Sequence, residues 1–262
     1  MSLPDRPLAE ARNLLLVTAT IAPNKDMPGN ALTDATERLG HYEHALRSYL
    51  SFPGPYPDQI LFCENSGYDL TSLRAIAQNE NPHRKPVHFW SFTPDTSPKL
   101  GKGYSEMEIL DRAYETYLAD LSERTVVWKM TGRLVVKNLD RLIRSRPPAS
   151  RVYIDMRKLP FVGHKRNISC YADTRIMAYT PAAYKDLLYQ FKDGRTWVNE
   201  RGLFDHLYAA ARTDKAITPR FRIQPRVQGV DGTLLKDYGG PAQVFKDNVR
   251  GLARTVTPWL WI

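Results

Sequence analysis

The sequence is poor in the residues that build disulfide frameworks and cysteine-rich metal sites. Its 262 residues include only two cysteines, Cys63 and Cys170, and no Cys-X-X-Cys pair. This usage is typical of a reducing compartment, and we therefore predict a cytoplasmic protein. No apolar run approaches the roughly 18 residues needed to cross a bilayer. The run at 14–22 is interrupted by threonines, so it predicts a buried strand rather than a signal peptide.

Closely spaced carboxylates are also missing from the sequence. The pattern Asp-X-Asp, which holds Mg²⁺ or Mn²⁺ beside a diphosphate, does not occur, and neither does His-Glu-X-X-His. His41 and His44 stand at helical spacing without a further ligand cluster, and we interpret them as surface histidines. The sequence therefore predicts no metal site and no cofactor.

Positive charge is what the sequence has in excess. Lys and Arg total 37 against 28 Asp and Glu, which gives a net charge of +9. This excess indicates an anionic partner, namely a nucleic acid, a phosphorylated small molecule or an acidic membrane surface, or it serves solubility alone. The hydrophobic fraction of 42% is that of an ordinary globular protein.

Apolar runs rich in β-formers alternate with helical patterns. Strands are predicted at 14–22, 59–64, 86–92, 125–130, 151–155 and 175–179. Helices are predicted at 34–50, 70–78, 104–121, 138–144, from Pro181 and at 201–211, with a loop at 94–103, an extended stretch at 221–230 and a turn at 230–233. The alternation predicts an α/β fold with a mostly parallel sheet and helices on both faces. We predict one domain over 1–218 and a C-terminal appendage over 219–262.

Polar residues follow the predicted strands, at the edge where sheets of this class bind ligands. The first strand carries Thr18 and Thr20, and the second ends in Glu64 and Asn65, which can read a base or a ribose or simply form a turn. The segment Gly-Lys-Gly-Tyr-Ser-Glu at 101–106 opens into a helix, which favours contact of an anion with Lys102 and Gly103. Glu106 either contributes to this binding site or only stabilises the helix by interacting with its dipole.

The segment Trp-Lys-Met-Thr-Gly-Arg at 128–133 ends the fourth strand. Lys129 and Arg133 flank Thr131 and Gly132, and the arginine can hold phosphate oxygens in a bidentate manner. Further candidates follow later strands and begin a late helix: Asp155, Arg157, Asp173, Glu200 and Asp205.

Six segments that follow one another in the chain are together similar to small bacterial glycosyltransferases of O-antigen and capsular polysaccharide clusters. They are LLLVTATIAP, RLGHYEHAL, ILFCENSGYDL, GKGYSEMEIL, WKMTGRLVVKNL and YIDMR with the later ADTR. The resemblance covers roughly 14–207. It implies a GT-A-like fold and transfer of a sugar, a hexose being favoured, from a nucleotide-sugar donor. UDP-sugars are favoured as donor, and the acceptor is a growing surface polysaccharide, such as lipopolysaccharide, or a lipid-linked glycan.

The resemblance also suggests roles for the candidates. The donor-binding set is Thr18, Thr20, Arg38, Glu64, Asn65, Lys102, Gly103, Glu106, Lys129, Thr131, Gly132, Arg133, Asp155 and Arg157. If transfer inverts the sugar, the base that deprotonates the acceptor is Glu200, Asp205 or Asp173, and the sequence does not choose among them. A retaining reaction would need no such base, and the sequence does not decide between the two. Because Lys129 and Arg133 stand where the family places Asp-X-Asp, we predict that cations replace a divalent metal at the diphosphate.

Two other classes of protein remain as alternatives. A methyltransferase or nucleotidyltransferase is the first alternative, although the glycine-rich turn of a methyltransferase is absent after Val17. A nucleic-acid-binding module ranks last because the cations are spread along the chain.

The C-terminus predicts a basic amphipathic helix. Its apolar face is Val244, Phe245, Val249, Leu252 and Val256, and its basic stripe is Lys246, Arg250 and Arg254. Two readings stay open: the segment 244–262 lies on an anionic membrane, at the inner face of the cytoplasmic membrane, or the helix docks on its own domain.

Overall fold

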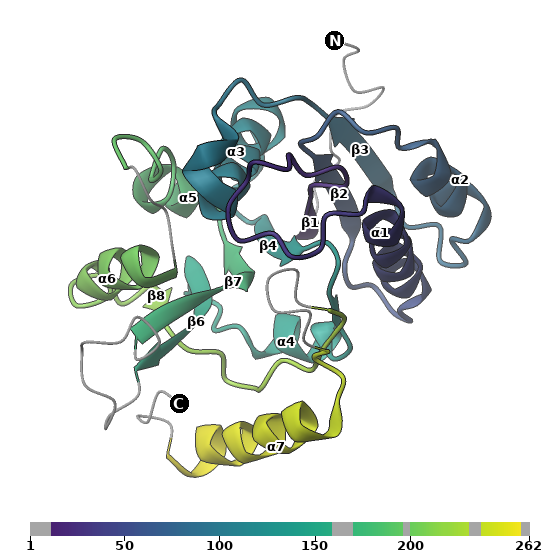
Figure 1. Ribbon diagram of the computed structural model, residues 1–262. Coiled ribbons are helices and arrows are strands. Elements are labelled where there is room, and N and C mark those ends of the chain that lie inside the picture. Colours follow the sequence, from purple (N-terminus) through teal and green to yellow (C-terminus); the bar gives the residue numbers. More distant parts are fainter. Residues whose placement is uncertain (1–11, 159–169, 196–199, 231–236, 258–262) are drawn as a thin grey trace.

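A seven-stranded mixed sheet forms the centre of the protein (Figure 1). The computed structural model describes residues 12–158, 170–195, 200–230 and 237–257. The strand order is β3-β2-β1-β4-β7-β6-β8. The strands are β1 (Asn13–Ala19), β2 (Gln59–Glu64), β3 (Val87–Ser91), β4 (Val126–Thr131), β6 (Val152–Lys158), β7 (Cys170–Tyr179) and β8 (Ile217–Thr218). All neighbours pair in parallel except β7, which runs antiparallel to β4 and β6.

Helices cover both faces of this sheet, and each face has its own hydrophobic core. One core packs under α1 (Ala35–Ser51), α2 (Thr71–Asn79) and α4 (Leu139–Ser145). The other packs under α3 (Gly101–Ala113), the π-helical turn η2 (Tyr114–Leu118), α5 (Pro181–Leu187) and α6 (Glu200–Ala210). This arrangement confirms the predicted fold class, a mostly parallel α/β sheet between two helical layers.

Local sequence signals explain where the elements begin. Alternate residues of β1 enter opposite cores, Leu14 and Leu16 on the α3 side and Leu15 and Val17 on the α1 side, so the strand is apolar from Leu14 to Val17. The Asp34 side chain accepts a hydrogen bond from the Glu37 amide and caps α1. Thr180 caps α5 in the same way, with Pro181 in the first turn.

Several predicted boundaries are wrong. The first strand ends at Ala19 instead of residue 22, and the predicted loop at 94–103 already turns helical at Pro98–Leu100 (η1) and enters α3 at Gly101. The last strand starts at Cys170, because Asp173 and Arg175 pair with each other and so are tolerated inside a strand. Most of the extended stretch at 221–230 is irregular, and most of the turn at 230–233 lies outside the described residues.

The described residues after Pro219, 220–230 and 237–257, lie at the lower side of the molecule as drawn in Figure 1. Phe221 is buried in the α1-side core and contacts the Tyr153 ring edge-on. The short strand β9 (Val227–Gln228) pairs with β5 (Val135–Val136), and α7 (Pro241–Val256) ends the described chain. No helix among the described residues is long and apolar enough to cross a membrane.

Candidate active site

A cavity of about 220 Å³ opens at the carboxyl ends of β1, β2 and β3, beside the start of α3. This is the edge at which α/β sheets bind ligands. Of the predicted donor-binding residues, Thr20 and Asn65 line the cavity, together with Ser66, Gly101 and Ser105. The exposed Lys102 stands in the first turn of α3, next to the lining, and Gly103 is partly buried within the same turn.

Asn65 connects two walls of the cavity. Its Oδ1 accepts a hydrogen bond of 2.6 Å from the Thr20 hydroxyl, and its Nδ2 donates one of 2.7 Å to the Ser105 hydroxyl. The side-chain amide is therefore fixed in orientation by β1 on one side and α3 on the other. A fixed amide and two hydroxyls can read the polar edge of a base or a ribose.

The next residue of α3, Glu106, points towards the central strands β1 and β4. Here Glu106 Oε1 accepts hydrogen bonds from Lys129 Nζ at 2.5 Å and from the Thr18 and Thr131 hydroxyls at 3.3 Å. Lys129 Nζ also donates to the Thr174 carbonyl. The lysine side chain is fully buried, whereas that of Glu106 is 25% exposed. Lys129 is thus part of the floor of the site and neutralises Glu106.

This placement corrects the role predicted for Lys129. The sequence suggested a cation that contacts a diphosphate, but the ammonium group has no exposed surface and three protein acceptors. The reason is its position on β4, a central strand with neighbours on both sides. A side chain that leaves such a strand towards α3 enters the core and needs an internal counter-ion.

Glu200, the first residue of α6, is the most perturbed carboxylic acid at this edge. Burial of the carboxyl and the negative charges of Asp173 and Glu106 raise its pKa to about 7, against the opposing effect of Arg175 and Lys102. The residue keeps exposed surface, so the crowded protein atoms around it do not close it off from a ligand. A carboxyl group that exchanges its proton near neutral pH and remains accessible can act as a general base or acid.

The other two acids predicted as bases have different surroundings. Burial by itself would raise the pKa of Asp173, but Arg175, which it faces in an ion pair, and Arg157 lower it to about 2. Asp205 is exposed and pairs with Arg201 one turn earlier on α6. Asp173 is therefore ionised at neutral pH, and Asp205 belongs to a surface ion pair.

Arg38 and Glu64 brace loops instead of facing the cavity. The Arg38 guanidinium donates to the carbonyls of Thr20 and Leu32, and it is buried. Glu64 has no exposed surface. Its carboxylate accepts hydrogen bonds from the Ile21, Ser66 and Tyr68 amides, in the turns after β1 and β2, and from the hydroxyls of Ser66 and of Ser91, the last residue of β3. We interpret both as structural residues that shape the cavity from behind.

Gly132 and Arg133 lie on the side of the sheet that faces α1. A Cβ atom at Gly132 would stand 2.8 Å from the Thr18 carbonyl oxygen, so glycine is required for close packing. Arg133 donates a hydrogen bond to the Val230 carbonyl. Burial lowers the pKa of His41, and the positive charge of Arg133 lowers it further. The structure therefore does not bring Arg133 together with Lys129, because the turn after β4 directs it away from α3.

Asp155 and Arg157 belong to a separate cluster beneath α7. Both Asp155 oxygens accept hydrogen bonds from Arg254, at 2.8 and 2.6 Å, and both side chains are buried. Arg157 lies 3.6 Å from Asp155 and 3.8 Å from Asp173. Sequence reasoning missed Arg254 as the partner of Asp155 because 99 residues separate them.

Two residues missed by the sequence analysis complete the site, Ser105 and Thr174. Ser105 stands inside the Gly-Lys-Gly-Tyr-Ser-Glu segment, three residues after Lys102, so helical spacing would have placed it beside the other candidates. Thr174 contributes its carbonyl to Lys129 and its hydroxyl to Glu200, at 3.4 Å. No sequence signal marks a backbone carbonyl as a partner.

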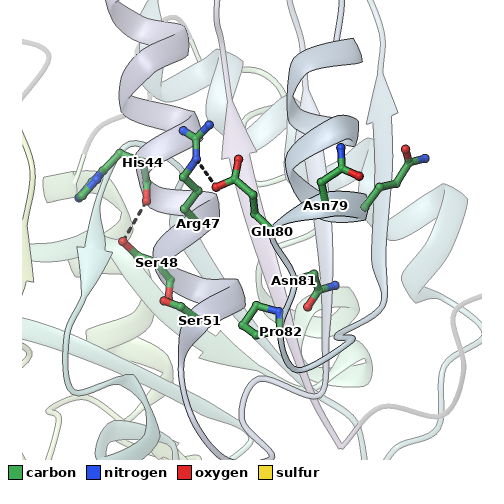
Figure 2. A pocket seen from close by; sticks show the side chains of 9 residues that line it. His44, Arg47, Ser48, Ser51, Asn79, Glu80, Asn81 and Pro82 are labelled. Atoms are coloured by element: carbon green, nitrogen blue, oxygen red, sulfur yellow. Dashed lines mark hydrogen bonds and ion pairs between the residues drawn. The ribbon is translucent and has the colours of Figure 1, made fainter.

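A larger hollow, of about 540 Å³, lies between the C-terminal ends of α1 and α2 (Figure 2). These helix ends are at the opposite edge of the sheet from Glu200, since each helix runs back from the carboxyl end of a strand. Arg47 and Glu80 pair across the hollow, and Ser48 bonds to the His44 carbonyl. Its charged groups already have partners, and it contributes none of the candidate residues.

No group of three or more His, Cys, Asp or Glu among the described residues is arranged to hold a metal ion. The acids nearest the site, Glu106 and Asp173, each have a basic partner. The absence of a metal centre stays a prediction of the sequence. Neither cation that was expected to replace the metal lies at the cavity, since Lys129 is internal and Arg133 faces α1.

Comparison with known proteins finds likeness in structure only. No protein-family model matches the chain, and no curated protein matches it. Among solved structures, a 4-diphosphocytidyl-2C-methyl-D-erythritol synthase aligns with 92% of this chain and 99% of its own at 13% identity and a TM-score of 0.45.

The galactosyltransferase LgtC, solved with donor and acceptor sugar analogs, aligns with 92% of each chain at 12% identity and a TM-score of 0.45. The inositol-1-phosphate CTP transferase from T. maritima aligns with 91% of this chain and 95% of its own, again at 12% and 0.45. At these identities and scores the likenesses decide nothing about chemistry. The resemblance to polysaccharide glycosyltransferases therefore stays a prediction, and the function is argued from the residues of the site.

Proposed function

We propose that the protein is a glycosyltransferase that moves a sugar from a nucleotide-sugar to an acceptor hydroxyl. The observation that carries the proposal is Glu200, an accessible carboxyl with a pKa of about 7 at the carboxyl edge of the sheet. Transfer with inversion needs a group that takes the proton of the attacking hydroxyl. A carboxyl tuned to neutral pH is suited to that step.

The cavity at the carboxyl ends of β1, β2 and β3 offers groups that suit a nucleotide donor. Asn65, Thr20 and Ser105 present a fixed amide and hydroxyls for the base or ribose. The N-terminal end of α3, with Lys102 in its first turn, favours the negative charge that develops on the leaving diphosphate. In this scheme Lys129 holds Glu106 in place, and Glu106 presents its exposed part towards the sugar.

A binding and turnover experiment tests the proposal. We expect UDP and UDP-hexoses to raise the melting temperature of the protein, and Asn65→Ala to weaken that binding more than Asn81→Ala, a change at the distant hollow between α1 and α2. Hydrolysis or transfer of the bound nucleotide-sugar should continue after EDTA treatment. A nucleotidyl transfer from a nucleoside triphosphate, or stabilisation by S-adenosylmethionine alone, would overturn the proposal. A strict requirement for added Mn²⁺ would overturn only its metal-free part.

A further inference from the structure

The helix α7 docks with its polar side inward, against the segment 221–226 and against Asp155 of β6. Arg254 donates to both Asp155 oxygens, to the Phe221 carbonyl and to Gln224, and it is buried. Asp247 is buried as well and accepts from Gln224 Nε2 at 3.1 Å. These contacts fix the rotation of the helix, because turning it by half a turn would leave Asp155 buried without its guanidinium.

The opposite side of α7 is apolar and exposed to solvent. The large hydrophobic residues that the described chain exposes are all on this helix, with exposed fractions from 45% to 69%: Val244, Phe245, Val249, Leu252 and Val256. In Figure 1, α7 runs along the outer rim with one side turned away from the rest of the protein. A single exposed apolar residue needs no explanation, but a continuous row along a helix indicates a contact surface.

This arrangement corrects the predicted basic stripe. Of its three residues only Lys246 is exposed, since Arg250 is partly buried beside Asp247 and Arg254 is internal. The helix does dock on its own domain, as one of the two readings held, but through the polar side. The apolar side is therefore left for another contact.

We propose that this apolar side of α7 inserts into the surface of an anionic lipid bilayer. Charge complementarity supports a lipid occupant: residues 219–262 contain seven Lys or Arg and three Asp, and of these cations Arg222 and Lys246 are exposed among the described residues. The sequence after the helix, Pro-Trp-Leu-Trp-Ile, adds two tryptophans, which favour the interface between membrane and water. An interfacial helix needs only one apolar face and flanking positive charge.

A second copy of the chain is less well suited to cover the face. A helix of 16 residues is about 24 Å long and about 10 Å wide, so it offers roughly 240 Å². A stable dimer buries about 800 Å² on each partner. A bilayer has no such threshold, because the lipid surface adapts to a single helix.

Co-sedimentation of the full chain with vesicles tests this surface. We expect binding to phosphatidylethanolamine–phosphatidylglycerol vesicles, and a loss of more than about tenfold in the partition coefficient for the double variant Phe245→Ser, Leu252→Ser. Lys246→Ala should cost up to about fivefold, on anionic vesicles only. Thr255→Ser, on the same exposed side, is the matched control and should bind like the parent.

Three results would overturn the inference: no vesicle binding by the parent chain, equal binding by the double variant, or a dimer in vesicle-free solution that the double variant abolishes. Circular dichroism checks that the exposed substitutions leave the fold intact. The inference does not depend on the proposed function, because α7 contributes no residue to the candidate site. We therefore expect the double variant and the parent to turn over a soluble acceptor at the same rate.

Discussion

The region around Glu200 and the region beneath α7 both gather charged side chains at the carboxyl edge of the sheet. Beneath α7, Asp155 is matched by a guanidinium that satisfies both its oxygens. Around Glu200, Arg175 is already engaged by Asp173. Burial of the carboxyl, together with the negative charges of Asp173 and Glu106, outweighs the effect of Arg175 and Lys102 and raises the pKa of Glu200 to about 7.

The difference distinguishes a carboxylate that stabilises the fold from a carboxyl that can exchange a proton near neutral pH. A buried carboxylate with its own arginine stays ionised and holds two elements together. A carboxyl that is desolvated and lies near other negative charges holds its proton to higher pH and releases it close to neutrality. Each of the following predictions tests this separation, beginning with the largest effect.

Substitution of Glu200 by Gln should lower turnover by about 10²- to 10⁴-fold, because the amide cannot accept the proton of the acceptor. In the parent enzyme turnover should rise with pH through about 7, where Glu200 loses its proton. Initial rates across pH 5 to 9, a range set around that value, measure both effects. Asp205→Asn is the control on the same helix and should leave the profile in place. A Glu200→Gln variant with the parent's pH profile would remove this residue from catalysis.

Substitution of Arg254 by Met should lower the free energy of unfolding by about 3 kcal/mol, because it leaves Asp155 buried without a bidentate partner. Denaturant titration measures the loss. Arg250→Met, on the same side of α7 but partly exposed, should cost less than half as much. Equal stability of both variants would show that the region beneath α7 is not held by this pair.

Asp173 connects the two regions, and its replacement by Asn tests both. Its pKa is lowered on folding from 3.8 to about 2, so it stabilises the fold above pH 4, and this contribution is lost as the pH falls towards 2. The variant should lose about 2 kcal/mol at neutral pH, and the difference from the parent should vanish at acid pH. Removing the negative charge should also shift the rise in turnover due to Glu200 to lower pH. An unshifted profile would show that Asp173 does not act on Glu200.

The smallest effect is expected at Arg201. Its pair with Asp205 is exposed on α6, and Arg201→Ala should change the free energy of unfolding by only about 0.3 to 0.5 kcal/mol. Thermal unfolding at low and high salt measures it, and the small difference should shrink further in salt. A loss as large as that of Arg254→Met would mean that exposure does not separate the two kinds of pair.

Much of the architecture could be predicted because it depends on local signals. The second strand lies at Gln59–Glu64 as its apolar run indicated, and Asp34 and Pro181 mark the starts of α1 and α5. The candidate site was predicted in part. Thr20 and Asn65 line the cavity, and Glu200 was among the three acids considered. What the segments could not reveal is which side of the sheet each residue faces.

The sequence by itself determined the α/β class, because strand and helix periodicities are properties of short stretches of chain. It also determined that α7 has one apolar and one charged side. Only the tertiary structure decided that Lys129 is internal, that Arg133 faces α1, and that α7 turns its polar side inward. Each of these outcomes depends on a partner distant in sequence, and the partner decides whether a charge is neutralised, buried or left to react.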